Sequence, residues 1–96
     1  MTDPAGELTE DAFLGGQLRL RQRKSGHRAG HDAVLLAAAT PARSGHRVID
    51  FGAGVGAAGL ALARRVAGVE LVLVEIDAEL AELARSVAAR GECHVP

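Results

Sequence analysis

The chain has 96 residues, of which 48% are hydrophobic and 24% charged, and its formal net charge is −1 at pH 7. This length and composition fit one small globular domain and argue against wholesale disorder or a coiled coil. The charge gives no global signal for nucleic-acid binding, and the only aromatic residues, Phe13 and Phe51, are too few for a base-stacking platform.

Three features concern the compartment. The longest uncharged apolar stretch, residues 33–39, is far shorter than the roughly 20 residues that a membrane helix needs. The chain starts with the acidic segment 1–4, whereas a secretory signal starts with basic charge. The single cysteine, Cys93, cannot form an internal disulfide, which fits a reducing environment. We therefore expect a cytoplasmic protein with no membrane span.

The first half of the chain, residues 1–45, predicts an arm with a short strand and a helix. Residues 1–12 are polar and contain Pro4 and Gly6, so we expect them to be mobile. Residues 17–23 alternate between leucine and polar residues, which indicates a half-exposed strand. Residues 32–39 are apolar and precede Pro41, which predicts a helix that ends there.

The second half, residues 46–96, predicts a strand–helix–strand–helix unit and hence an α/β fold. Residues 48–51 form a short strand, residues 57–66 a helix, and Gly68 suits a left-handed helix end. The apolar run 71–74 within residues 69–76 predicts a strand buried on both faces of a parallel sheet. Asp77 suits the N-cap of a last helix. One face of that helix is apolar: Leu80, Leu83, Ala84, Val87 and Ala88.

The junction between the first strand of this unit and its helix is rich in glycine. Glycines allow a sharp turn and let a ligand reach the free backbone N–H groups of a helix N-terminus. Glu75 ends the next strand, about 20 residues later, and a right-handed crossover places the two strand ends side by side. Glu75 could there accept hydrogen bonds from a ribose diol. The alternative is a glycine turn that serves only helix–strand packing.

Two nucleotide patterns fit this junction. Gly54, Gly56 and Gly59 match the dinucleotide fingerprint GxGxxG. The run from Asp50 through Gly52 and Gly54 to Gly56 matches the DxGxGxG pattern of class I S-adenosylmethionine (SAM) methyltransferases. A carboxylate at Asp50 would repel a pyrophosphate but attract the ammonium and sulfonium of SAM. The long segment before this strand also favours SAM, although Asp50 could instead cap nearby backbone amides.

Residues 13–75 resemble the bacterial tRNA adenine-N6 methyltransferases of the methyltransferase small domain group. The most specific segments are residues 16–22 (GQLRLRQ) and 28–37 (RAGHDAVLLA). The resemblance implies a partial Rossmann-like fold and transfer of the SAM methyl group to an exocyclic amine of adenine in tRNA. It implies that Asp50, Gly52, Gly54 and Gly56 hold the methionine end of SAM. It further implies that Glu75 binds the ribose, Ile76 packs on the adenine, and the segment containing Gly30 and Asp32 shapes the site.

The chain departs from this family in its catalytic motif. The family has an Asn-Pro-Pro-aromatic motif after its fourth strand, which holds the target amine. This chain contains no asparagine, and its three prolines are isolated at Pro4, Pro41 and Pro96. We therefore assign no catalytic residue, and we expect a truncated member that is inactive alone. A non-catalytic interaction module with an inherited glycine loop and, less favoured, a dinucleotide-binding module remain alternatives.

Partner predictions follow from charge and from the short sheet. A two-stranded parallel core leaves the strand at residues 48–51 with an apolar edge, so we expect a homo-oligomer that covers this edge and completes the core. Cys93 and His94 are adjacent with no second cysteine, so we expect no metal site. A basic stretch could contact RNA phosphates, or pair with the acidic residues before it. It comprises Arg19, Arg21, Arg23, Lys24 and Arg28.

Overall fold

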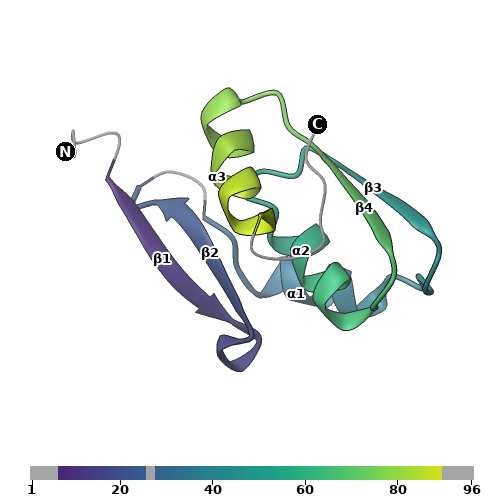
Figure 1. The fold of residues 1–96 in the computed structure, drawn as a ribbon. Coiled ribbons are helices and arrows are strands. Elements are labelled where there is room, and N and C mark those ends of the chain that lie inside the picture. The colour runs from purple at the N-terminus through teal and green to yellow at the C-terminus, as the bar shows by residue number, and fades with distance from the viewer. Residues whose placement is uncertain (1–6, 26–27, 90–96) are drawn as a thin grey trace.

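The fold, seen in a computed structural model, contains a β-hairpin followed by an α/β unit (Figure 1). The structure describes residues 7–25 and 28–89. The elements in order are β1 (Leu8–Phe13), a 3₁₀ turn (Leu14–Gly16), β2 (Leu18–Arg23), α1 (His31–Ala39), β3 (Arg47–Phe51), α2 (Ala57–Arg65), β4 (Glu70–Val74) and α3 (Ala78–Ala88). None of these helices is long and apolar enough to cross a membrane.

Strands β1 and β2 form an antiparallel hairpin in which Leu8 lies opposite Arg23 and Phe13 opposite Leu18. The predicted strand at residues 17–23 is therefore confirmed. The prediction of a mobile arm is wrong for residues 8–12, and residues 1–6 lie outside the described part. Polar residues Thr9 and Asp11 lie half-buried within β1 and are held by hydrogen bonds, so this strand lacks an apolar signature.

Helix α1 begins at His31, one residue before the predicted start, and ends at Ala39 before Pro41. Its last carbonyl groups lie beside α2, where the Arg65 guanidinium donates hydrogen bonds to the carbonyl oxygens of Ala37 and Thr40. A cation at a helix C-terminus also complements the negative end of the helix dipole. Arg65 therefore joins the end of α1 to the end of α2.

Strands β3 and β4 pair in parallel, with Ile49 beside Val72 and Phe51 beside Val74. The predicted parallel arrangement is confirmed, and α2 covers one face of the pair. The prediction that β4 is buried on both faces is wrong, because Val72 is half-buried and Val74 exposed. No described element covers that second face.

The ends of the last two helices bear out some of the predicted detail. Helix α2 ends at Arg65 rather than Val66, and the positive φ of Gly68 (80°) belongs to the turn after it. The Asp77 carboxylate accepts hydrogen bonds from the backbone N–H groups of Glu79 and Leu80, which confirms the N-cap of α3. The predicted apolar face of α3 is buried except for the half-buried Leu80.

One core joins the hairpin to the α/β unit. Leu18 and Leu20 of β2 belong to the same buried cluster as Leu71 and Leu73 of β4 and Leu83 of α3. Figure 1 shows the hairpin beside α3, away from β3 and β4. The boundary at residue 45 stays a prediction about chain organisation, since the core contains residues from both of its sides.

Candidate nucleotide site

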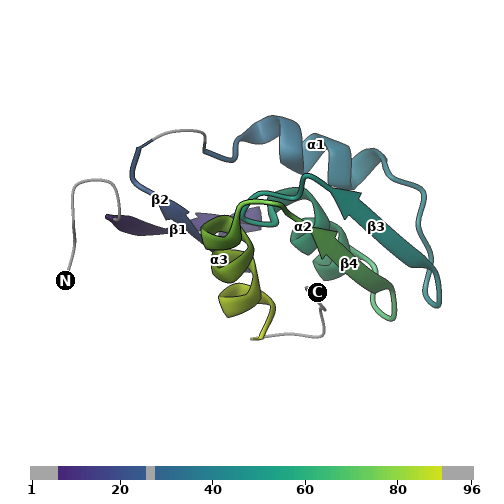
Figure 2. The same cartoon turned by 90° about the horizontal axis from the view of Figure 1, so that it is seen from above.

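The glycine loop, residues 52–56, connects the carboxyl end of β3 to α2 (Figure 2). The N–H groups of Gly52 and Ala53 both donate to the carbonyl oxygen of Val74, at 2.8 and 3.0 Å, so the loop is fixed to the end of β4. Gly52, Gly54 and Gly56 all have positive φ, at 70°, 60° and 90°. Glycine adopts these angles without the steric cost that a Cβ atom brings.

The glycines of this junction divide into two kinds. A Cβ atom at Gly52 or Gly54 would meet nothing within 4 Å, so their backbone borders open space. A Cβ atom at Gly56 would lie 2.9 Å from Leu60 and 3.0 Å from Leu73. A Cβ atom at Gly59 would overlap Leu73. The packing explanation therefore accounts for Gly56 and Gly59, whereas Gly52 and Gly54 leave a cradle of bare backbone at the start of α2.

Asp50 lies half-buried on the side of β3 that faces α2. Burial raises the pKa of its carboxyl group, while a hydrogen bond from the backbone N–H of Gly59, in the first turn of α2, lowers it. The nearby Glu75 charge also raises this pKa. Asp50 thus caps α2, which is the alternative role considered for it, and each carboxylate oxygen has further acceptor capacity.

Glu75 follows β4 and joins two loops. Its Oε1 accepts a hydrogen bond from Gly54 N at 2.7 Å, and its Oε2 accepts one from Asp77 N at 2.9 Å. These two bonds hold the pKa of the carboxyl group below its usual value. Sequence reasoning placed Glu75 beside the glycines correctly but missed this structural role, for which the sequence carries no signal.

Acid should destabilise the protein through Glu75. Because its folded-state pKa is lowered, its ionisation contributes stability above pH 4.5, and this contribution is lost as the pH falls through and below that value. We expect Glu75→Gln to lower the melting temperature at pH 7 and to reduce the further drop at pH 4. Thermal melts followed by circular dichroism measure both. Glu82→Gln, on the exposed face of α3, should keep the wild-type pH dependence; an unchanged dependence in Glu75→Gln would contradict the assignment.

The remaining predicted site residues are Ile76, which lies next to Glu75, and Gly30 and Asp32, which lie at the start of α1. Ile76 follows Glu75 and its side chain is fully exposed, as contact with an adenine ring would require. Gly30 is the N-cap of α1, and Asp32 lies exposed in its first turn. No hydrogen bond among the described residues joins residues 30–32 to the glycine loop. The structure therefore brings together Asp50, the three loop glycines and Glu75, and leaves the role of Gly30 and Asp32 a prediction.

A polar network that the sequence did not reveal holds the segment before α1. The Asp11 carboxylate accepts hydrogen bonds from Gln22 Nε2 (2.9 Å) and Arg28 (2.8 Å). Gln22 is 2% exposed, and its Oε1 accepts from the backbone N–H of Ala29. The pKa of Asp11 is lowered by a hydrogen bond from Thr9 together with those from Gln22 and Arg28. The hairpin thereby fixes the chain just before Gly30. The sequence signal from which this network could have been predicted is the polar residues at alternate positions of both strands.

Most of the basic stretch is engaged in ion pairs. Arg19 pairs with Glu10 at 3.9 Å, Lys24 with Glu7 at 3.4 Å and Arg28 with Asp11 at 2.8 Å. The alternative of pairing with the preceding acids therefore holds for these three. Arg23 reaches the start of α3, where it pairs with Asp77 at 3.1 Å and Glu79 at 2.7 Å. Contact with RNA through these residues and Arg21 stays a prediction.

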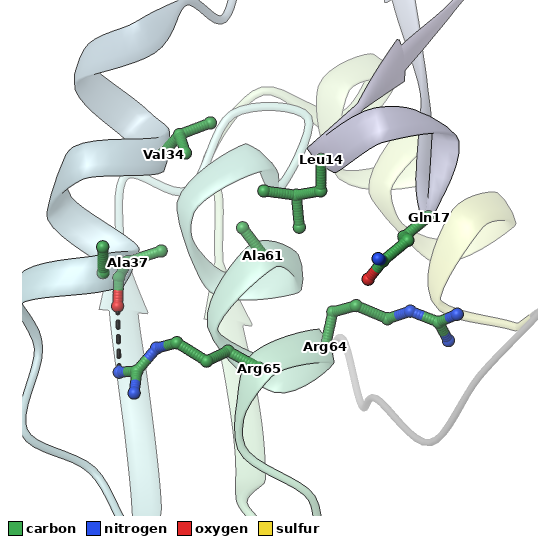
Figure 3. A pocket seen from close by; sticks show the side chains of 8 residues that line it. Leu14, Gln17, Val34, Ala37, Ala61, Arg64 and Arg65 are labelled. Atoms are coloured by element: carbon green, nitrogen blue, oxygen red, sulfur yellow. Dashed lines mark hydrogen bonds between the residues drawn. The ribbon is translucent and has the colours of Figure 1, made fainter.

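A pocket of about 330 Å³ lies apart from the glycine loop, between the 3₁₀ turn, α1 and α2 (Figure 3). Its lining includes Leu14, Val34 and Arg64, and none of the predicted site residues. No group of three or more potential metal ligands occurs among the described residues. Cys93 and His94 lie outside them.

The parallel strands, the open glycine cradle and the acid after β4 have the arrangement that is found in nucleotide-binding α/β units. Residues 25–95 match the family described as "Methyltransferase small domain". The chain belongs to this family, as its resemblance predicted. Membership of a methyltransferase family implies SAM as the methyl donor.

Three curated relatives carry the name tRNA1(Val) (adenine(37)-N6)-methyltransferase. The protein from Cronobacter sakazakii is 37% identical over 86 residues, which are 88% of this chain and 35% of the relative. The Enterobacter protein is 33% identical, over 95% of this chain and 38% of its own length. The Flavobacterium psychrophilum protein is 39% identical, over 75% and 31%. This chain therefore spans about a third of the length of these relatives.

Proposed function

We propose that this chain is the SAM-binding part of a methyltransferase that modifies an exocyclic amine of adenine in tRNA, and that it acts in the cytoplasm. The names of the relatives support the substrate. The chain has the residues proposed for the cofactor site, but it lacks the Asn-Pro-Pro-aromatic motif that holds the target amine in this family. The isolated chain should accordingly bind SAM without transferring its methyl group.

The open backbone at Gly52 and Gly54 is the observation that carries this proposal. A Cβ atom at either position would occupy free space beside the N-terminus of α2, where N–H groups attract polar ligand atoms. Asp50 and Glu75 supply two carboxylates next to this space, which suits a cationic methionine group and a ribose diol better than a pyrophosphate. Asp50 would hold the methionine end together with the three loop glycines, Gly52, Gly54 and Gly56. Glu75 would bind the ribose, and Ile76 would pack on the adenine.

Titration calorimetry with SAM, with its demethylated product and with NAD tests the proposal. We expect saturable binding of both SAM-type ligands and none of NAD. Binding of NAD alone would favour the dinucleotide-binding alternative. Failure of all three ligands would leave the non-catalytic interaction module. The observation that supports this module is the face of the β3–β4 sheet that residues 7–25 and 28–89 leave uncovered.

Asp50→Asn separates the charge of this residue from its capping role. Asparagine keeps an oxygen that can accept from Gly59 N–H, so the fold should persist, but the negative charge is lost. Because charge-assisted hydrogen bonds contribute about 1.5–3 kcal/mol, SAM affinity should fall about tenfold or more. Glu82→Gln removes one carboxylate from the exposed face of α3 and should leave SAM affinity unchanged. Equal affinity in Asp50→Asn and wild type would remove Asp50 from the site.

A further inference from the structure

Arg23, the last residue of β2, forms ion pairs with the start of α3, beside which β2 lies (Figure 1). Its Nη2 group donates to both carboxylate oxygens of Asp77, at 3.2 and 3.1 Å, and its Nε group donates to Glu79 at 2.7 Å. The backbone of Arg23 is fixed in turn, because its carbonyl oxygen accepts a hydrogen bond from Arg28 at 2.6 Å. Asp77 and Glu79 lie 54 and 56 residues further along the chain, so these contacts join the hairpin to the α/β unit.

Asp77 connects Arg23 to the candidate nucleotide site. The carboxylate that accepts from Arg23 also caps the first turn of α3. The backbone N–H of Asp77 donates to one oxygen of Glu75 at 2.9 Å, and the other oxygen of Glu75 accepts from Gly54 N–H at 2.7 Å. The contacts therefore run without interruption from Arg23 through Asp77 and Glu75 to the glycine loop.

The acidic segment around Glu75 receives its cation from a distant part of the chain. Residues 69–82 include five acidic residues and no basic one. The Asp77 and Glu75 carboxylates repel each other, and the guanidinium of Arg23 offsets part of this repulsion. An ionised Glu75 accepts stronger hydrogen bonds from backbone N–H groups than a neutral carboxyl group would. Arg23 thus favours the charge state in which Glu75 holds the glycine loop.

We propose that Arg23 is a positioning residue for the cofactor: through Asp77 it keeps Glu75 in the orientation that fixes Gly54 and receives the ribose. Each oxygen of Glu75 accepts one hydrogen bond and keeps a further lone pair, so it can still bind a ribose hydroxyl. Only the ribose contact rests on the proposed function. Ion pairs as exposed as these contribute little to the free energy of unfolding, so the effect of Arg23 lies in the geometry of the loop.

The amide proton of Gly54 reports this role without any ligand. A proton in a short hydrogen bond to a carboxylate resonates downfield and exchanges slowly with solvent. In proton–nitrogen NMR spectra of the full chain, we expect Arg23→Met to move the Gly54 proton signal upfield and to speed its exchange. Methionine keeps an unbranched stem but removes the charge and the donors. The Gly52 proton, which is donated to Val74 rather than to Glu75, should keep its shift and its exchange rate.

Asp77→Asn tests the route of the effect. Asparagine keeps an oxygen that caps α3 but loses the charge that pairs with Arg23. Arg23→Met should therefore shift the Gly54 signal less in the Asp77→Asn background than in the wild type, as a double-mutant cycle reports. Arg19→Met is the matched control, because Arg19 lies on the same strand but pairs with Glu10 of β1. It should leave the Gly54 signal unchanged.

Titration calorimetry extends the test to the cofactor. We expect SAM affinity to fall about two- to fivefold in Arg23→Met, the range that an exposed ion pair supports, and to stay at the wild-type value in Arg19→Met.

Three results would overturn the proposal. The first is an unchanged Gly54 signal in Arg23→Met, or a Gly52 signal that shifts as much as that of Gly54. The second is additivity of Arg23→Met and Asp77→Asn, which would exclude the route through Asp77. The third is an altered Gly54 signal with unchanged SAM affinity, which would exclude a role toward the cofactor. A wild-type chain that binds no SAM would instead contradict the proposed function, and the Gly54 signal would still decide whether Arg23 holds Glu75.

Discussion

Gly59→Ala should lower the free energy of unfolding by about 1–3 kcal/mol, the usual cost of overpacking a filled core. The added Cβ atom would overlap Leu73, which is fully buried, and would lie 3.1 Å from Leu71. In an unconstrained helix the same change is stabilising by up to about 1 kcal/mol, so the sign of the effect reports the close approach of α2 to β4. Urea unfolding followed by circular dichroism measures it.

Two further variants show whether the clash is the cause. Leu73→Val removes volume from the side chain that the new Cβ atom would meet. In that background Gly59→Ala should become neutral or stabilising, which a double-mutant cycle reports as a coupling energy. Ala58→Leu adds more volume at the preceding, half-buried position of α2 and should cost less than Gly59→Ala. Additive effects of Gly59→Ala and Leu73→Val would show that the helix and strand are not in the assigned contact.

Gly54→Val should reduce SAM affinity at least tenfold while the protein remains folded. The valine side chain would enter the open space that the cofactor is proposed to occupy, so binding is lost by exclusion. The backbone cost of a Cβ atom at a φ of 60° is about 1–2 kcal/mol, which lowers stability without unfolding the domain. Calorimetric titration with SAM and a thermal melt give the two quantities.

Gly15→Val is a closely matched control. Gly15 has a φ of 64° and, as at Gly54, an added Cβ atom would meet nothing within 4 Å, but Gly15 lies in the hairpin turn. The two variants should lose similar stability, and Gly15→Val should bind SAM as the wild type does. Equal SAM affinities in the two variants would show that the cofactor does not occupy the space beside Gly54.

Local patterns predicted most of the elements because each has a strong short-range signal. The leucine–arginine alternation of β2, the proline after α1 and the N-cap at Asp77 all lie within a few residues of the structure that they specify. The first strand escaped prediction because its inward positions are polar. Thr9 and Asp11 are stabilised by Gln22 and Arg28, which are distant in sequence, and no periodicity of apolar residues marks such a strand.

The sequence predicted which residues make up the candidate site, but it did not predict the hydrogen bonds between them. The spacing of Asp50, the glycines and Glu75 sufficed to place them together, since a right-handed crossover brings two parallel strand ends to one edge. It did not predict that Glu75 binds Gly54 N–H and Asp77 N–H, or that the Gly59 N–H binds Asp50. Such hydrogen bonds depend on loop geometry that residue types alone leave undetermined.

Residue types at fixed spacing were enough to predict the family, the parallel strand–helix–strand unit and the glycine pattern. Whether a glycine serves packing or leaves open backbone depends on the distance between α2 and β4, which the folded chain alone reveals. The structure also shows that Ile49, Phe51 and Val74 lie on a face of the sheet that no described element covers. An apolar strand has the same sequence whether one or both of its faces are covered, because covering elements come from elsewhere in the chain or from another chain.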